Sequence, residues 1–192
     1  ENELKLQELC YDLTALDKNE LLDLQKYILG LSIDRINTAK YLVKIKIALN
    51  RCEQSQLEML CTGLLFKSLD EVISLKEKAT EMGFDEAVAK PFMISINDRI
   101  LSAQRDELTA LFADISNKKS AELYKLLEVL NSGRYSSMFV KYYSNRILLA
   151  NDSIARSELE ELCSDCSSLD RDGLVKLKAK INEKSFRPQI KN

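Results

Sequence analysis

Two cysteines near the end of the chain have a spacing that can support chemistry. Cys163 and Cys166 form a C-x-x-C sequence, which occurs both in metal sites and in thiol–disulfide exchange proteins. A zinc site needs two more ligands, and because the chain has no His, these would be distant thiols or carboxylates. A thiol redox or metal protein is therefore the least favoured function for this chain.

Other catalytic arrangements are not visible in the sequence. Without His, the chain lacks the commonest general base and the serine-protease type of triad. Carboxylates are numerous, but none interrupts an apolar stripe, where burial would raise its pKa for acid–base work. The 5 Gly residues form no phosphate-binding loop. We predict that the protein is not an enzyme and holds neither a cofactor nor a metal.

Apolar residues recur along the chain at a spacing of 51 residues, without a gap. Any amphipathic helical chain matches itself at some shifts, but a shift that stays in phase across three junctions indicates an internal repeat. The recurring sets include Leu6, Leu57, Leu108 and Leu159; Leu21, Val72, Leu123 and Leu174; and Ile45, Ile96 and Ile147.

The C-x-x-C cysteines fall on the same pattern. Small apolar side chains pack well in helical cores, and a free thiol behaves as one of them. We therefore predict that both cysteines are packing residues. Cys163 corresponds to Cys10, Cys61 and Phe112, and Cys166 corresponds to Leu13, Leu64 and Ile115.

Polar residues that start helices recur as well. Capping boxes, in which a side-chain oxygen and a Glu satisfy the N–H groups of the first turn, are predicted at Asp17 with Glu20 and at Ser68 with Glu71. In the third copy the capping residue is Ser120, which comes one residue late, with Glu122. In the fourth copy it is Asp170. A second set of caps is Asp34, Asp85 and Ser136, preceded by Gly30, Gly83 and Gly133, where helices end with positive φ. A third set is Ser55, Asp106 and Ser157.

These signals predict three helices in each copy. In the second copy they span about 56–66, 69–82 and 86–104, and the restriction that Pro91 places on Lys90 allows the last of them to begin at Pro91. The apolar stripes on the two sides of the third set of caps differ in phase. We favour a break or sharp kink there, the alternative being one bent helix whose halves face different neighbours.

The predicted fold is all-α, with about three and a half copies of the 51-residue unit in a single domain, 1–192. A unit of this size cannot close a core alone, so neighbours must stack. An α-solenoid of armadillo- or HEAT-like size is favoured over a compact helical bundle, but no signature of those families is present and none is assigned. The copies span approximately 4–54, 55–105, 106–156 and 157–192.

Charge and cysteine content bear on partners and location. The chain has 28 basic and 30 acidic residues, so it has no overall attraction for nucleic acid or anionic membranes, and its apolar runs are too short to span a bilayer. An odd number of cysteines, 5, predicts reduced thiols and a cytoplasmic location. Because the chain starts at Glu1 rather than Met, we expect a processed product or a piece of a longer protein.

The stripe opposite the apolar face of the third helix is the candidate partner-binding face. Solenoids use one helix per repeat to line a binding surface, and exposed aromatic and Arg residues are favoured at interfaces. The alternative is an ordinary solvated face, because the row shares no chemistry between copies. The candidate residues are Lys40, Lys44, Arg51, Tyr142, Arg146 and Leu149.

The favoured function is a non-catalytic helical-repeat module that binds another protein or acts as a scaffold in a larger intracellular protein. The alternative to it is a nucleic-acid-binding repeat with a weak basic face, for which balanced charge gives little support. Electrostatic binding of that kind weakens steeply with salt. The residues of that basic face would be Lys40, Lys44, Arg51, Lys176, Lys180 and Lys184.

Overall fold

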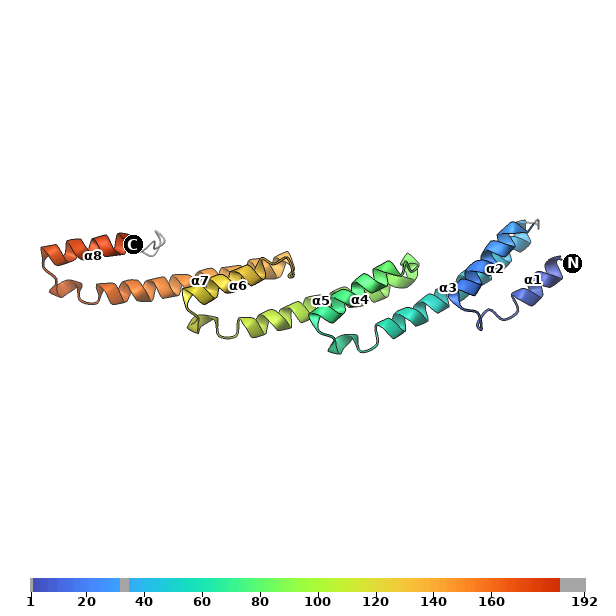
Figure 1. Ribbon diagram of the computed structural model, residues 1–192, viewed down its shortest axis with the longest axis horizontal. Helices are drawn as coiled ribbons and strands as arrows, with labels where there is room; N and C mark the ends of the chain where they lie inside the picture. The colour runs from blue at the N-terminus through green and yellow to red at the C-terminus, as the bar shows by residue number, and fades with distance from the viewer. Residues whose placement is uncertain (1, 32–34, 184–192) are drawn as a thin grey trace. The chain divides into compact units, whose positions relative to one another are not determined.

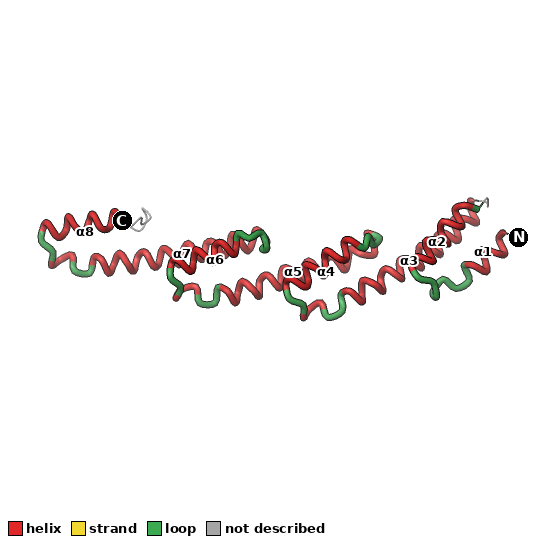
Figure 2. The backbone as a smooth tube through the Cα atoms, in the orientation of Figure 1, coloured by secondary structure: helices red, strands yellow, loops and turns green. Residues whose placement is uncertain are grey.

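The computed structural model describes residues 2–31 and 35–183 (Figure 1). These residues form eight α-helices and three short 3₁₀ helices, with no strand among them (Figure 2). The predicted all-α class is therefore confirmed. The chain divides into two compact units, residues 1–103 and 104–192.

The first unit contains two hydrophobic cores. Its elements are α1 (Asn2–Leu9), α2 (Lys18–Gly30), α3 (Arg35–Leu60), η1 (Leu64–Phe66), α4 (Leu69–Glu81) and most of α5 (Glu86–Leu111). α2 lies along the first part of α3 (Figure 1). The first core joins α1, α2 and α3 through Leu6, Cys10, Leu21, Ile28, Tyr41, Ile45, Ala48 and Leu49. The second joins the end of α3 to α4 and α5 through Leu57, Val72, Leu75, Ala79 and Ile96.

The second unit contains the end of α5 and the elements that follow it. After the end of α5 come η2 (Ile115–Asn117), α6 (Ser120–Leu130), α7 (Ser137–Cys163), η3 (Cys166–Ser168) and α8 (Arg171–Glu183). α6 lies against α7, and the Phe112 and Tyr143 rings pack with their centroids 4.5 Å apart. Its buried side chains include Leu108, Phe112, Ile115, Leu123, Leu130, Phe139, Tyr143 and Ile147.

The element boundaries recur along the chain in steps of 51 residues. The long helices α3, α5 and α7 begin at residues 35, 86 and 137, and the 3₁₀ helices begin at 64, 115 and 166. The short helices α2, α4, α6 and α8 begin at 18, 69, 120 and 171. Fully buried positions follow the same steps, since Leu6, Leu57 and Leu108 are all 0% exposed.

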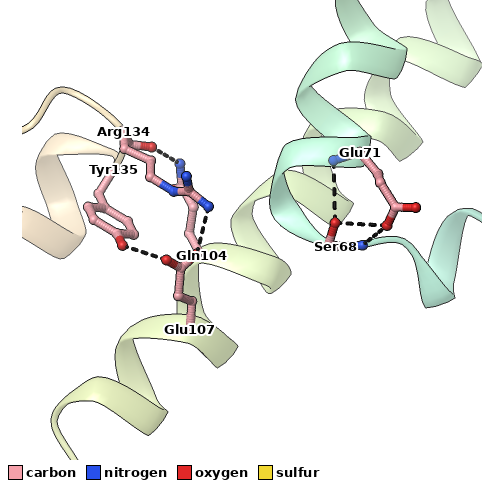
Figure 3. Close-up of polar contacts among 6 residues, drawn as sticks. All are labelled: Ser68, Glu71, Gln104, Glu107, Arg134 and Tyr135. Atoms are coloured by element: carbon pink, nitrogen blue, oxygen red, sulfur yellow. Dashed lines mark hydrogen bonds and ion pairs between the residues drawn. The ribbon is translucent and has the colours of Figure 1, made fainter.

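The predicted caps of the short helices are mostly present. Asp17 accepts from the N–H of Glu20 at 2.9 Å, and the Glu20 carboxylate accepts from the N–H of Asp17 at 2.8 Å. Ser68 and Glu71 form the same capping box (Figure 3). The Asp170 carboxylate accepts from the N–H of Gly173 at 2.8 Å. In α6 only the Glu half forms, because Lys119 donates its N–H to Glu122 at 2.9 Å while Ser120 is already the first helical residue.

The break predicted at the third set of caps is wrong. Ser55, Asp106 and Ser157 lie inside the uninterrupted helices α3, α5 and α7. A Ser or Asp inside a helix costs only about 0.5 kcal/mol relative to Ala, and no Gly or Pro follows to stop the helix. α3 is continuous, and its two halves contribute to different cores, as the alternative predicted of the neighbours that they face.

The second set of caps is confirmed in part. Asp85 accepts from the N–H of Ala87 at 3.0 Å, whereas the Ser136 hydroxyl makes no capping hydrogen bond and Asp34 lies outside the described residues. Gly83 and Gly133 have φ of 60° and 82° as predicted. Gly30 instead remains the last residue of α2, because Leu31 closes the helix in an extended conformation with its N–H donated to Ile28.

The position of Pro91 also differs from the prediction. α5 begins at Glu86, so Pro91 lies within the helix rather than at its start. The turn before it is held by the Asp85 carbonyl, which accepts from the N–H groups of Val88 and Ala89. These two hydrogen bonds form the first turn of α5, which precedes Pro91. The missing N–H of Pro91 therefore falls in the second turn.

Candidate functional site

The basic residues predicted on the first copy's face are exposed on α3. Lys40, Lys44 and Arg51 are spaced so that they lie on one side of the helix. The ammonium groups of Lys40 and Lys44 lie 6.0 and 5.7 Å from the ring centroid of Tyr41, whose side chain is buried. The buried Tyr41 ring therefore lies beneath Lys40 and Lys44, whose ammonium groups face solvent.

A groove runs beside this stripe. It has a volume of about 590 Å³ and lies between α3 and the loop that follows α1. Lys44, Ile47 and Arg51 line it from the helix, and Tyr11 and Leu13 line it from the loop. Lys40 is not among its lining residues. The Ile47 side chain is 48% exposed, so the groove offers an apolar contact between two cations.

Some of the charged side chains at this groove have a hydrogen-bond or ion-pair partner, and others have none among the described residues. The Asp12 carboxylate accepts from the hydroxyl of Thr14 and from its N–H, the latter at 2.9 Å, and these hydrogen bonds hold the pKa of Asp12 below its usual value. Lys18 pairs with Glu53 at 2.9 Å. Among the described residues, no carboxylate lies within ion-pair distance of Lys44 or Arg51. Within the described residues, Lys44 and Arg51 are therefore the cations of the groove without an ion-pair partner, and the groove also contains the Asp12 and Asp17 carboxylates.

A hollow of about 620 Å³ connects α3 to α5 on the same side of the first unit. Ile47 and Arg51 line it from α3, and Pro91, Phe92 and Ser95 line it from α5. The stripe opposite the apolar face of α3 and the corresponding stripe of α5 thus border the same hollow.

The predicted residues of the third copy lie on α7 in the second unit. The Tyr142 ring meets the Tyr143 ring edge-on with centroids 5.0 Å apart, and the Arg146 guanidinium lies 5.8 Å from the Tyr143 centroid. Leu149 is 68% exposed. Arg146 and Leu149 line a groove of about 510 Å³, whereas Tyr142 does not.

The two grooves have corresponding linings, 102 residues apart. Lys44 corresponds to Arg146 and Ile47 to Leu149. Their charge differs, because Arg51 is replaced by Ser153 and the second groove also contains Glu158 and Glu161. Sequence reasoning found the helical side of both grooves. It missed the loop side, formed by Tyr11 and Leu13 in one and by Ile115 and Ser116 in the other, because no local pattern shows which helix a loop will lie against.

The cysteine thiols are all free. Cys10 is buried and Cys163 and Cys166 are partly buried. Burial raises the pKa of the Cys166 thiol, and a hydrogen bond with the Cys163 thiol raises it further. Burial also raises the pKa of Cys10. A raised pKa lowers the thiolate fraction, so these thiols are poorer nucleophiles than ordinary cysteines.

The carboxylates with shifted pKa values take part in structural contacts. Hydrogen bonds from the N–H and hydroxyl of Ser68 lower the pKa of Glu71. The Lys46 ammonium, followed by the N–H of Ala87, lowers the pKa of Asp85. Within the described ranges, no group of three or more His, Cys, Asp or Glu side chains is placed to hold a metal ion.

The basic residues of the nucleic-acid alternative fall in both units. Lys40, Lys44 and Arg51 are on α3 of the first unit, and Lys176 and Lys180 are exposed on α8 of the second. Lys184 lies outside the described residues. The exposed basic residues therefore form one stripe on α3 and another, of Lys176 and Lys180, on α8.

Comparison of the chain with protein-family models, with curated proteins and with solved structures finds no match. Across residues 2–31 and 35–183, no helix combines the length and apolar content that crossing a bilayer requires.

Proposed function

We propose that the chain is a tandem helical repeat with a unit of 51 residues. Three independent features support this proposal: the helix boundaries, the buried apolar positions and the two buried polar residues, Glu53 and Gln104, all recur at this step. The unit consists of the second half of one long helix, a short helix and the first half of the next long helix. We propose that such units stack as a solenoid rather than as a compact bundle.

We infer that the repeat is a non-catalytic module that binds another protein, as an interaction or scaffold segment of a larger intracellular protein. The observation that carries this inference is the exposed apolar residue beside a cation in both grooves, Ile47 with Lys44 and Leu149 with Arg146. Arg is enriched at protein interfaces, and each groove has one among its lining residues, Arg51 in the first and Arg146 in the second. The five free thiols support a reducing compartment, and hence the cytoplasm, as its location.

The cationic groove of α3 favours a particular class of partner. Lys44 and Arg51 flank Ile47, and their charge is not neutralised by carboxylates of the described residues. A peptide with one apolar side chain between acidic residues would complement this groove in shape and charge. The partner proposed for this groove is therefore an acidic peptide segment with an apolar anchor.

Selection from a displayed peptide library tests this function. We expect the wild-type chain to enrich acidic peptides with an apolar anchor, and Ile47→Asp and Arg51→Glu to weaken their binding by about tenfold or more. Lys78→Glu, which makes the same charge change at an exposed position of α4, is the matched control and should bind normally.

Two results would contradict the proposal. One is enrichment of peptides that bind the Ile47→Asp and Arg51→Glu chains as tightly as the wild type. The other is salt-sensitive binding of single-stranded RNA or duplex DNA that Arg51→Glu abolishes, because this would favour the nucleic-acid alternative.

A further inference from the structure

The hollow between α3 and α5 belongs to a stripe that is exposed in every copy. Ile47 and Leu149 are 48% and 68% exposed, and Asp98, at the corresponding position of α5, is exposed as well. The exposed residues at a second corresponding position are Lys40, Pro91 and Tyr142. No element of the described residues covers this stripe in any of the three copies, so the hollow is a surface that a partner can reach.

The hollow adjoins the cationic groove of α3 along a shared ridge. Ile47 and Arg51 line both depressions. Asn50 lines only the hollow and Cys52 only the groove, because at 3.6 residues per turn these two side chains lie on opposite sides of the row that contains Ile47 and Arg51. A segment that crosses this ridge can therefore contact both depressions.

The hollow contains two hydrogen-bond acceptors that lack their usual donors. The side-chain oxygen of Asn50 is buried and has no hydrogen-bond partner among the described residues. On α5, the regular donor to the Ala87 carbonyl would be the N–H of residue 91, which is a proline and has none. Asn50 is only partly buried as a residue, so rotation of its carboxamide can present the oxygen to a ligand. A buried acceptor without a donor is unfavourable, and the hollow therefore favours a ligand that donates hydrogen bonds.

The rest of the lining combines an apolar wall with one cation. Val88, Pro91 and Phe92 form the wall on α5, and Arg51 contributes the charge from α3. An acidic residue next to an apolar one would complement both features. The two acceptors also bear on the conformation of the partner, because a helix uses its own N–H groups beyond the first turn, whereas an extended segment leaves its N–H groups free to donate.

We propose that the partner segment is an extended peptide that crosses from the cationic groove into the hollow, where the Asn50 side chain accepts one of its backbone N–H groups. An apolar side chain of the peptide packs on Pro91 and Phe92, and a neighbouring carboxylate pairs with Arg51. This inference rests on the proposed function, to which it adds the conformation of the peptide and a second contact site.

Acidic peptides enriched on the full wild-type chain from the displayed library provide the probes. Each is synthesised with single N-methyl groups at successive backbone nitrogens, which removes one N–H at a time. We expect methylation at one position to weaken binding to the wild-type chain by about tenfold. The same methylation should have little further effect on binding to the Asn50→Leu chain, because its acceptor is already absent.

Asn50→Leu also separates binding from folding. Leu101 occupies the corresponding position of α5, so the repeat accommodates this side chain. We expect unmethylated peptides to bind Asn50→Leu about tenfold more weakly than the wild type, while its unfolding free energy stays the same or increases, because an unsatisfied acceptor has been removed. Asn97→Leu makes the same change at an exposed position of α5 outside both depressions and should bind normally.

A second variant fills the hollow from the α5 side. Ala87→Met places a long side chain where α7 has the exposed Met138, so the fold should tolerate it. We expect peptide binding to weaken by about tenfold or more. Ala39→Met, at an exposed position of α3 outside both depressions, is the matched control and should bind normally.

Several outcomes would overturn this inference. If Asn50→Leu and Ala87→Met bind as tightly as the wild type while Arg51→Glu binds weakly, the peptide occupies the groove alone, and the proposed function stands without the second contact site. An N-methyl scan in which no position depends on Asn50, or a bound peptide that is helical by nuclear magnetic resonance, would also overturn it. A failure to enrich acidic peptides on the wild-type chain would contradict the proposed function and this inference together.

Discussion

The backbone N–H of Asp85 donates to a carboxylate oxygen of Glu53 at 2.8 Å, joining the middle of α3 to the residue before α5. The other oxygen of Glu53 pairs with Lys18 at 2.9 Å. In the second unit, the Gln104 side chain donates to the Arg134 carbonyl at 2.8 Å (Figure 3). It also accepts from the N–H of Ser136 at 3.2 Å. Each buried polar side chain thus satisfies the backbone that leads into the next long helix.

Removal of the Glu53 side chain is predicted to destabilise the protein. Glu53 is 7% exposed, and Glu53→Ala leaves the Asp85 N–H unpaired and Lys18 without its carboxylate. We expect a loss of about 2–3 kcal/mol of unfolding free energy, measured by urea denaturation.

Glu53→Gln separates the hydrogen bond from the charge. Gln can still accept from the Asp85 N–H, as Gln104 does from Ser136, so we expect a loss of about 1 kcal/mol or less. If Glu53→Gln were as destabilising as Glu53→Ala, the ion pair with Lys18 rather than the backbone hydrogen bond would hold this junction.

The two lowered carboxylate pKa values predict a loss of stability in acid. Because Glu71 and Asp85 bind protons less readily in the folded state than in the unfolded state, their contribution is complete above the unfolded pKa of about 4 and is lost as the pH falls through the folded value. Glu71→Gln and Asp85→Asn should each be less stable than the wild type at pH 7 and lose less stability on acidification. Parallel pH curves of unfolding free energy for variants and wild type would show that these contacts contribute nothing.

Pro91→Ala is predicted to stabilise α5. Pro91 lies inside the helix, where it removes one backbone hydrogen bond and crowds the preceding turn. We expect a gain of about 1–2 kcal/mol in unfolding free energy, whereas Lys90→Ala, at the exposed neighbouring position, should change it by less than about 0.5 kcal/mol. A destabilised Pro91→Ala chain would mean that packing of the proline ring outweighs the hydrogen bond.

The Cys166 thiol is predicted to react slowly. Its raised pKa lowers the thiolate fraction at neutral pH, so alkylation by iodoacetamide at pH 7 should be slower than that of an unstructured cysteine peptide and should accelerate above the usual thiol pKa of about 8.5. Cys163→Ala removes a hydrogen bond that raises this pKa and should accelerate the reaction at Cys166. Fast alkylation of the wild-type thiol at pH 7 would instead support the redox alternative.

Part of the candidate site was predictable because it depends on one helix. The 3.6-residue period places Lys44, Ile47 and Arg51 on one side of α3 from sequence alone. The groove also needs Tyr11 and Leu13 from the loop after α1, and that juxtaposition depends on how α1 packs on α3. No local signal encodes it.

Helix starts were predictable for the same reason. A capping box such as Asp17 with Glu20 involves residues within one turn, so residue type and spacing are sufficient to identify it. Helix continuity was not predictable in this way. Ser55 has the chemistry of a cap but lies within α3, because packing on both sides of it outweighs a weak local preference.

By itself, the sequence determined the all-α class, the 51-residue period and the positions of most caps, since these follow from residue spacing along a single helix. Only the tertiary structure decided which of the periodic apolar residues are buried. Leu21 and Leu174 occupy corresponding positions and have the same side chain, yet one is 0% and the other 45% exposed. Burial of such a residue requires a neighbouring helix that comes later in the chain, and for Leu21 of α2 this helix is α3.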